Sequence, residues 1–159
     1  MKILLAQHGE AVTREEDPDR PLTPQGRKDV ERTAAFLRDA GITAMRVLHS
    51  GKTRARQTAE ILARSLHTVS DPEIRHGIGP GDAVEPLLRD IARWDEDTLV
   101  VGHLPFMALL TSQLVTGQDA VGISAYRPGT ITCLEKNSAG HWIIAWMVRP
   151  ELLGAPRRA

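Results

Sequence analysis

Short apolar runs alternate with longer stretches of helical periodicity along most of the chain. Each run is bounded by glycine or polar residues, as expected of strands that are buried on both faces of a sheet. The runs lie at KILLAQ (2–7), MRVLHS (45–50) and DTLVVGH (97–103). Apolar residues with helical spacing predict amphipathic helices at 24–40 and 53–67. A third helix is predicted at 82–94 and a largely apolar one at 104–117.

Capping signals indicate where the first helix begins and ends. Thr23 followed by Pro24 is typical of a helix start, and Gly41 supplies the stop. The apolar positions between them keep helical spacing, and Phe36 is one of them. We expect that face to pack on the sheet.

The second half of the chain adds a long loop and a hairpin. Residues 70–82 are rich in Pro, Gly and Asp, so they predict a loop, after which Asp82 is expected to cap the helix over 82–94. GTITCLEK (129–136) and HWIIAWMV (141–148), joined by NSAG, predict an antiparallel hairpin.

This order of elements predicts an α/β fold. Strands that alternate with helices favour a three-layer sandwich, with a mainly parallel central sheet, an antiparallel C-terminal edge hairpin and helices on both faces. The chain has 159 residues, of which 42% are hydrophobic, so it can bury one continuous core. We expect a single domain over 1–150 and a C-terminal tail over 151–159.

Charge and cysteine content narrow the functional class. The 20 basic and 20 acidic residues give a formal net charge of zero, which argues against nucleic-acid and anionic-membrane partners. No apolar run approaches the roughly 18 residues of a membrane span, and no signal-peptide pattern follows Met1. The single cysteine, Cys133, cannot form an internal disulfide. These features predict a cytoplasmic protein.

Polar clusters follow all three of the predicted parallel strands. They are QHGE (7–10), HSGKTRARQT (49–58) and GHLP (102–105). In sheets of this kind the ligand crevice lies beyond the carboxyl ends of the parallel strands. We therefore expect His8, Arg54 and His103 to meet in one pocket, beside a helix N-terminus whose free N–H groups suit a phosphate.

The clusters resemble the signature of the histidine phosphatase superfamily, also called phosphoglycerate mutase-like. That signature is an Arg-His-Gly turn after the first strand, a second arginine at a helix start and a later histidine. Four segments carry the resemblance in family order: ILLAQHGEA (3–11), RPLTPQG (20–26), SGKTRARQTAE (50–60) and LVVGHLP (99–105). The short chain, without a large insertion between the second and third clusters, resembles the SixA-type bacterial phosphohistidine phosphatases in particular.

The resemblance implies a role for each matched residue. His8 would be the nucleophile, Arg54 a phosphate clamp and His103 a second imidazole that binds the phosphoryl group. Such chemistry needs neither a metal ion nor another cofactor when cationic groups neutralise the phosphoryl oxygens. Around the two histidines no cysteine or carboxylate shows metal-ligand spacing. The residues expected to bind substrate are Gln7, Gly9, Arg20 and Leu104.

Gln7 departs from the signature, because it stands where the superfamily has its first arginine. Glutamine donates a hydrogen bond but carries no charge, so the phosphate clamp is expected to be weaker. An arginine in a phosphoryl-transfer site can contribute ~10³ or more in rate. Arg20 or Arg75, each in a predicted loop, is a candidate to restore the missing charge.

The general acid is the second open point. Superfamily members that act on phosphomonoesters place a carboxylate to protonate the leaving alkoxide, and the candidates here are Glu10, Asp82 and Glu85. An imidazole leaving group departs once it is protonated and does not require the same placed acid. The absence of a clear acid therefore favours a phosphohistidine substrate.

The sequence thus predicts an enzyme: a metal-independent phosphatase that acts on phosphohistidine in a partner protein through a phosphoenzyme on His8. The short chain leaves little sequence for a lid, so an open crevice would admit a protein loop as well as a small phosphorylated substrate. Two alternatives stay open. Gln7 favours a catalytically impaired pseudophosphatase that binds phosphate or phosphohistidine without turnover, and a small-molecule phosphomonoesterase would use Glu10 or Asp82 as its acid.

Overall fold

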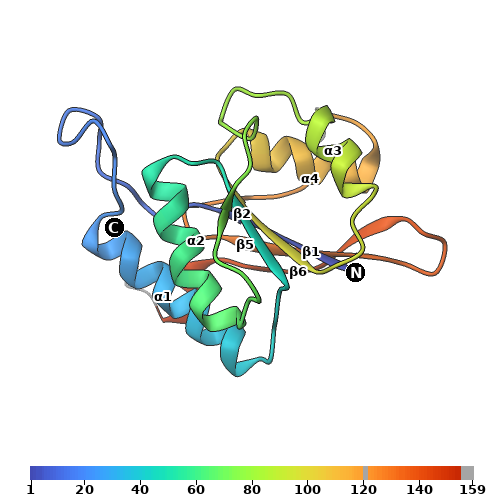
Figure 1. The fold of residues 1–159 in the computed structure, drawn as a ribbon, viewed down its shortest axis with the longest axis horizontal. Helices are drawn as coiled ribbons and strands as arrows, with labels where there is room; N and C mark the ends of the chain where they lie inside the picture. The colour runs from blue at the N-terminus through green and yellow to red at the C-terminus, as the bar shows by residue number, and fades with distance from the viewer. Residues whose placement is uncertain (120–121, 155–159) are drawn as a thin grey trace.

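One six-stranded sheet runs through the molecule in the computed structural model, which describes residues 1–119 and 122–154 (Figure 1). The strand order is β3-β2-β4-β1-β5-β6; the first four strands are parallel, and β5 and β6 are antiparallel to their neighbours. The strands are β1 (Lys2–Gln7), β2 (Arg46–His49), β3 (Glu73–Ile74), β4 (Thr98–Gly102), β5 (Ile131–Lys136) and β6 (Trp142–Val148). The predicted mainly parallel sheet with an antiparallel C-terminal edge is confirmed.

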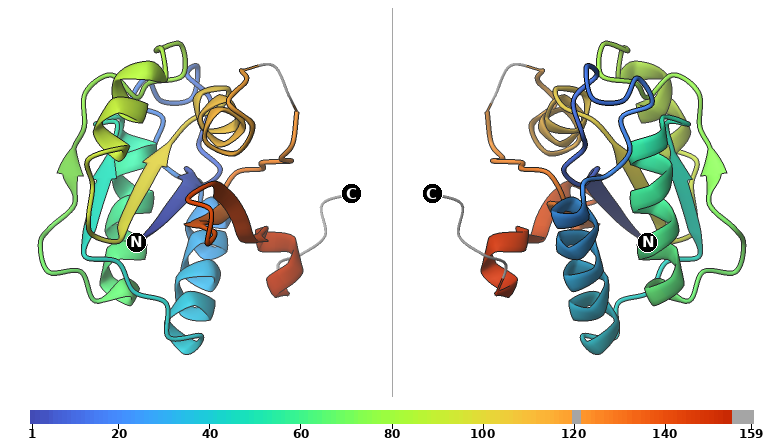
Figure 2. Two further views of the ribbon diagram at one scale, coloured as in Figure 1. Left: turned by 90° about the vertical axis from the view of Figure 1, so that its right-hand side faces the viewer. Right: turned by 90° about the vertical axis from the view of Figure 1, so that its left-hand side faces the viewer.

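Helices cover both faces of this sheet, as predicted. They are α1 (Pro24–Asp39), α2 (Thr53–Leu66), α3 (Glu85–Ile91) and α4 (Phe106–Thr116). The pair α1 and α2 lies on one face and the pair α3 and α4 on the other (Figures 1 and 2). Alternate residues of β1 enter the two cores: Leu4 and Ala6 belong to the first, and Ile3 and Leu5 to the second.

The first turn of α1 packs directly against the backbone that follows β1. Thr23 is the N-cap of the helix, as predicted, and its Oγ1 accepts a hydrogen bond from the Gly26 N–H at 2.9 Å. A Cβ at Gly26 would overlap the carbonyl oxygen of Glu10, and one at Gly9 would lie 2.7 Å from Val30 Cγ2. Glycine at both positions therefore allows the turn after β1 to sit on the helix.

The third helix starts later than predicted. It begins at Glu85, and its N-cap Val84 makes no side-chain capping bond. The Asp82 carboxylate instead accepts a hydrogen bond from the Gly79 N–H at 2.8 Å and closes a turn in the preceding loop. An aspartate can satisfy a loop N–H as readily as a helix N–H, so its presence alone does not locate a helix start.

Two smaller expectations also fail. The segment predicted as a loop over 70–82 contains β3, which pairs with β2 through only two residues. Phe36 is 43% exposed, whereas its neighbour Leu37 is fully buried. Adjacent residues cannot share one face of a helix, so burying Leu37 turns Phe36 outward.

The C-terminal hairpin is present as predicted, and Cys133 is buried within it. After β6 a short 3-10 helix, η1 (Pro150–Leu153), packs against α1. Residues 155–159 of the expected tail lie outside the described residues. Within the described part of the chain, no helix combines the length and apolar character needed to cross a membrane.

Candidate active site

Three parallel strands end side by side at one edge of the sheet. The register places Gln7 of β1 beside Gly102 of β4, and His49 of β2 beside Val101 of β4, so β4 lies between the other two. The residues after each strand therefore reach the same crevice. A cavity of about 450 Å³ opens there. Its lining includes seven residues that the sequence analysis named: Gln7, His8, Glu10, Arg20, Arg54, His103 and Leu104.

The His8 imidazole is held as a single tautomer. Its Nδ1 lies 2.6 Å from the Gly9 carbonyl oxygen, which can only accept, so Nδ1 carries the ring proton and donates it. The other nitrogen, Nε2, accepts a hydrogen bond from Arg54 Nε at 3.3 Å. The unprotonated nitrogen of the ring therefore faces the guanidinium.

The surroundings of His8 keep its ring neutral. Burial lowers the pKa of His8 from its ordinary value of 6.5 to about 4; the Gly9 carbonyl raises it, and the charges of Arg54 and Arg20 lower it further. At neutral pH the ring is consequently uncharged, and this is the form in which an imidazole nitrogen is a nucleophile.

Arg54 is fixed in the first turn of α2 and is only 9% exposed. The Thr58 hydroxyl donates to the Arg54 carbonyl at 2.8 Å and accepts from the Gly9 N–H at 3.0 Å, so one side chain joins the helix to the turn after β1. Burial, followed by the charges of Arg20 and Arg14, lowers the pKa of Arg54. Within the described residues Arg54 forms no ion pair, so its charge is available to an anionic ligand.

His103 follows β4 and is 1% exposed. The centroid of its ring lies 5.0 Å from that of His8. Its Nε2 is 2.6 Å from Ser50 Oγ, whereas its Nδ1 is buried and has no hydrogen-bond partner among the described residues. Burial, then His8 and three nearby cationic side chains, lowers the pKa of His103 to about 3, so this ring is also neutral at neutral pH.

Gln7 is the last residue of β1 and is 7% exposed. Its backbone N–H donates to the Thr130 carbonyl at 3.0 Å, and its side chain lines the cavity. The Oε1 atom is buried and makes no hydrogen bond within the described part of the chain. An unpaired buried amide oxygen is costly, and because it can only accept, a hydrogen-bond donor and not a phosphoryl oxygen would satisfy it.

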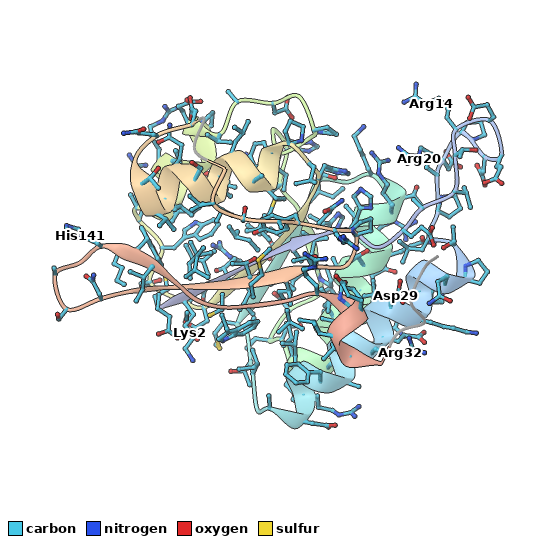
Figure 3. All side chains as sticks on the ribbon, turned by 180° about the vertical axis from the view of Figure 1, so that it is seen from behind. Lys2, Arg14, Arg20, Asp29, Arg32 and His141 are labelled. Carbon is cyan, nitrogen blue, oxygen red and sulfur yellow. The ribbon has the colours of Figure 1, made fainter. Side chains whose placement is uncertain are left out.

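Arg20 belongs to the loop between β1 and α1. Its backbone is left-handed, with φ at 48°, and its Nε donates to the Val12 carbonyl at 3.0 Å. Figure 3 shows Arg14 near the outer tip of this loop and the Arg20 side chain directed toward the body of the molecule. The positive charge of Arg20 lowers the pKa of both site histidines and of Arg54.

Arg75, the other candidate for the missing charge, points elsewhere. Its guanidinium pairs with the Asp90 carboxylate at 2.7 Å, and it is not among the residues that line the cavity. The structure thus brings Arg20, and not Arg75, to the site.

Of the three carboxylates considered as acids, only Glu10 lines the cavity. Its Oε2 accepts a hydrogen bond from Thr23 Oγ1 at 2.9 Å. Asp82 and Glu85 are exposed, and Asp82 is occupied by the Gly79 N–H. Across residues 1–119 and 122–154, no three His, Cys, Asp or Glu side chains are grouped so that they would hold a metal ion.

Comparison with known proteins identifies the family. The model of the histidine phosphatase superfamily (branch 1) matches residues 3–78, which contain His8 and Arg54. An uncharacterized protein of Picosynechococcus sp. is 31% identical over 138 residues, which cover 82% of this chain and 83% of that protein. The chain belongs to the histidine phosphatase superfamily.

Within this superfamily, the chain is similar to SixA. The phosphohistidine phosphatase SixA of Escherichia coli is 26% identical over 155 residues, which cover 94% of each protein. A solved structure of the protein histidine phosphatase SixA complexed with tungstate superposes with a TM-score of 0.83 and 25% identity, over 96% of this chain and 99% of that one. The three-layer fold and the order of its elements are therefore those of SixA.

Two polar residues of the candidate site were not singled out from the sequence. Thr58 follows Arg54 by four positions, one helical turn, so the spacing alone places both on one face of α2. Ser50 comes directly after β2, at the same sheet edge as His8 and His103. Its position after a buried strand is the signal that would have indicated it.

Proposed function

We propose that this histidine phosphatase removes the phosphoryl group from phosphohistidine in a partner protein, without a metal ion, through a covalent intermediate on His8. One observation carries the proposal: a neutral His8 ring whose unprotonated Nε2 faces the buried Arg54 at an open cavity. The similarity to SixA, which is named a phosphohistidine phosphatase, supports the same substrate class.

The reaction would proceed in two displacements at phosphorus. First the lone pair of His8 Nε2 attacks, and the P–N bond to the substrate imidazole breaks, so that this protonated ring leaves as neutral imidazole. A water oxygen then attacks the same phosphorus, the P–N bond to His8 breaks, and inorganic phosphate departs with Nε2 restored. Throughout, the Nδ1–H of His8 stays bonded to the Gly9 carbonyl, which supports the positive ring of the phosphorylated intermediate.

Cationic groups would neutralise the phosphoryl oxygens during both displacements. Arg54 is adjacent to Nε2 and has no competing ion pair within the described residues, and Arg20 adds a second guanidinium from the loop. The Gln7 amide supplies a neutral donor in the place of the signature arginine. The site therefore relies on Arg20 for charge that other members of the superfamily place on β1.

The leaving group favours phosphohistidine over a phosphomonoester. Among the three candidate acids Glu10 lines the cavity, and its Oε2 accepts a hydrogen bond from the Thr23 hydroxyl at the start of α1. A general acid for an alkoxide must instead direct a proton at the leaving oxygen. A protonated imidazole brings its own proton and does not require one from Glu10.

Gln7 favours a second candidate function, a phosphate-binding module without turnover. Its side chain is neutral, buried and lines the cavity where a guanidinium would otherwise lie. If Arg20 does not compensate, phosphohistidine would bind but the transition state would lack stabilising charge.

The test is phosphate release from a phosphohistidine-bearing protein and, in parallel, from an aryl phosphate. The chain is compared with His8→Ala, Gln7→Arg and His141→Ala, of which the last changes a histidine at the far end of the hairpin (Figure 3). We expect turnover of phosphohistidine that disappears in His8→Ala, persists in His141→Ala and changes little in Gln7→Arg. Turnover that first appears in Gln7→Arg would establish the binding module. A preference for the aryl phosphate would establish a phosphomonoesterase.

A further inference from the structure

The Ser50 hydroxyl lies between two nitrogen atoms of the site. Its Oγ accepts a hydrogen bond from the Lys52 N–H at 3.3 Å and lies 2.6 Å from His103 Nε2. A serine hydroxyl has one proton to donate and two lone pairs. The Lys52 N–H occupies one lone pair, and among the described residues Nε2 is the one acceptor within reach of the hydroxyl proton, so we take Ser50 as the donor to Nε2.

The protonation of His103 follows from that bond. The ring is neutral at neutral pH, since burial lowers its pKa to about 3, so it carries a single proton. If Nε2 accepts from Ser50, the proton must be on Nδ1. Nδ1 is buried and unpartnered among the described residues, and a buried donor without an acceptor is costly until one arrives.

The strand order indicates which acceptor this donor would meet. Because β4 lies between β2 and β1, His103 has Ser50 on one side and His8 on the other. His103 lines the same cavity as His8, and Nδ1 is the ring nitrogen that Ser50 leaves to a group bound there. A phosphoryl oxygen attracts an N–H and repels a bare lone pair, so the tautomer decides whether His103 helps or hinders binding.

We propose that Ser50 is a positioning residue: it holds His103 as the Nδ1–H tautomer, so that Nδ1 donates a hydrogen bond to a phosphoryl oxygen bound at His8. The proposal deepens the proposed function and rests on it for the identity of the phosphorylated substrate. Its structural half, the tautomer, stands on the geometry of Ser50 and His103 alone.

The tautomer is tested by nitrogen NMR on the full chain labelled with ¹⁵N-histidine, near neutral pH. We expect a protonated Nδ1 and an unprotonated Nε2 for His103. His49 is an internal reference of the opposite kind, because its Nδ1 accepts from the Gly51 N–H at 3.1 Å. The His103 signature should be lost in Ser50→Ala and kept in Ser50→Thr, which retains a hydroxyl. A His103 ring protonated on Nε2 in the unsubstituted chain would overturn the proposal.

Function is tested with the same variants. In Ser50→Ala we expect kcat for phosphohistidine to fall roughly 10- to 100-fold and the affinity for inorganic phosphate to fall with it, while Ser50→Thr recovers both. Ser138→Ala, in the exposed turn of the hairpin, should behave as the unsubstituted chain. If no form turns over, the proposed function fails, yet the NMR signature and phosphate affinity still decide the role of Ser50. Unchanged phosphate affinity in Ser50→Ala would refute that role.

Discussion

Burial of His8 predicts how the stability of the fold responds to acid. In the folded chain the pKa of His8 is about 4, because burial dominates its surroundings, whereas an unfolded chain returns the ring to about 6.5. As the pH falls, the unfolded state binds the proton first. The neutral ring therefore contributes stability that is fully present above about pH 6.5 and is lost as the pH falls toward about 4. Between about pH 7 and about pH 4.5 this loss amounts to about 2.5 kcal/mol.

Urea unfolding at those two pH values measures the effect. His8→Asn removes the titrating ring. Its free energy of unfolding should therefore fall less between the two pH values, and the difference from the fall in the unsubstituted chain should be about 2 kcal/mol. His141→Asn removes a histidine at the opposite end of the molecule from Arg20 (Figure 3) and should follow the unsubstituted chain. Equal losses in His8→Asn and the unsubstituted chain would refute the argument that burial keeps His8 neutral.

Three further outcomes are expected. The kcat/KM profile for phosphohistidine should hold as the pH falls through about 6 and decline only near about 4, since the neutral His8 ring is the reactive form; a decline centred near 6.5 would contradict this. Arg20→Gln should weaken the binding of inorganic phosphate about tenfold in titration calorimetry. Arg75→Gln breaks an ion pair outside the cavity and should leave phosphate binding unchanged. Similar losses of affinity in both variants would exclude a special role for Arg20. In urea titrations Thr23→Ala should lower the free energy of unfolding by about 1 kcal/mol, and Thr23→Ser should keep the value of the unsubstituted chain. No change in Thr23→Ala would count against the capping bond to the Gly26 N–H.

Features of the fold that depend on nearby residues could be predicted from the sequence. Thr23 caps α1 through an N–H three residues away, so every atom of that bond lies in one short segment. The start of α3 could not be placed in this way, because Asp82 has a competing donor in Gly79 and only the folded loop decides between them. Likewise β3 exists because β2 lies beside it, and two residues carry no periodicity of their own.

In the candidate site, too, some features could be predicted from the sequence and others depend on contacts between distant residues. That His8, Arg54 and His103 would approach one another follows from the parallel sheet, whose strand ends converge whatever the details of packing. Their protonation does not follow from the sequence, because it depends on burial and on single contacts such as that of Ser50 with His103. The sequence also could not decide whether Arg20 or Arg75 supplies positive charge to the site. Only the folded loops show that Arg75 pairs with Asp90.

The central position of β4 also has a consequence for synthesis of the protein. β1 and β2 emerge first from the ribosome, yet neither pairs with the other, and both await β4 as their common neighbour. Until β4 inserts, the His8 N–H lacks the Gly102 carbonyl that it contacts at 3.0 Å, and the second histidine of the site is still unplaced. Such a contact between distant parts of the chain forms late, since loop closure must precede it. The candidate site of a nascent chain should therefore be incomplete until its sheet is nearly whole.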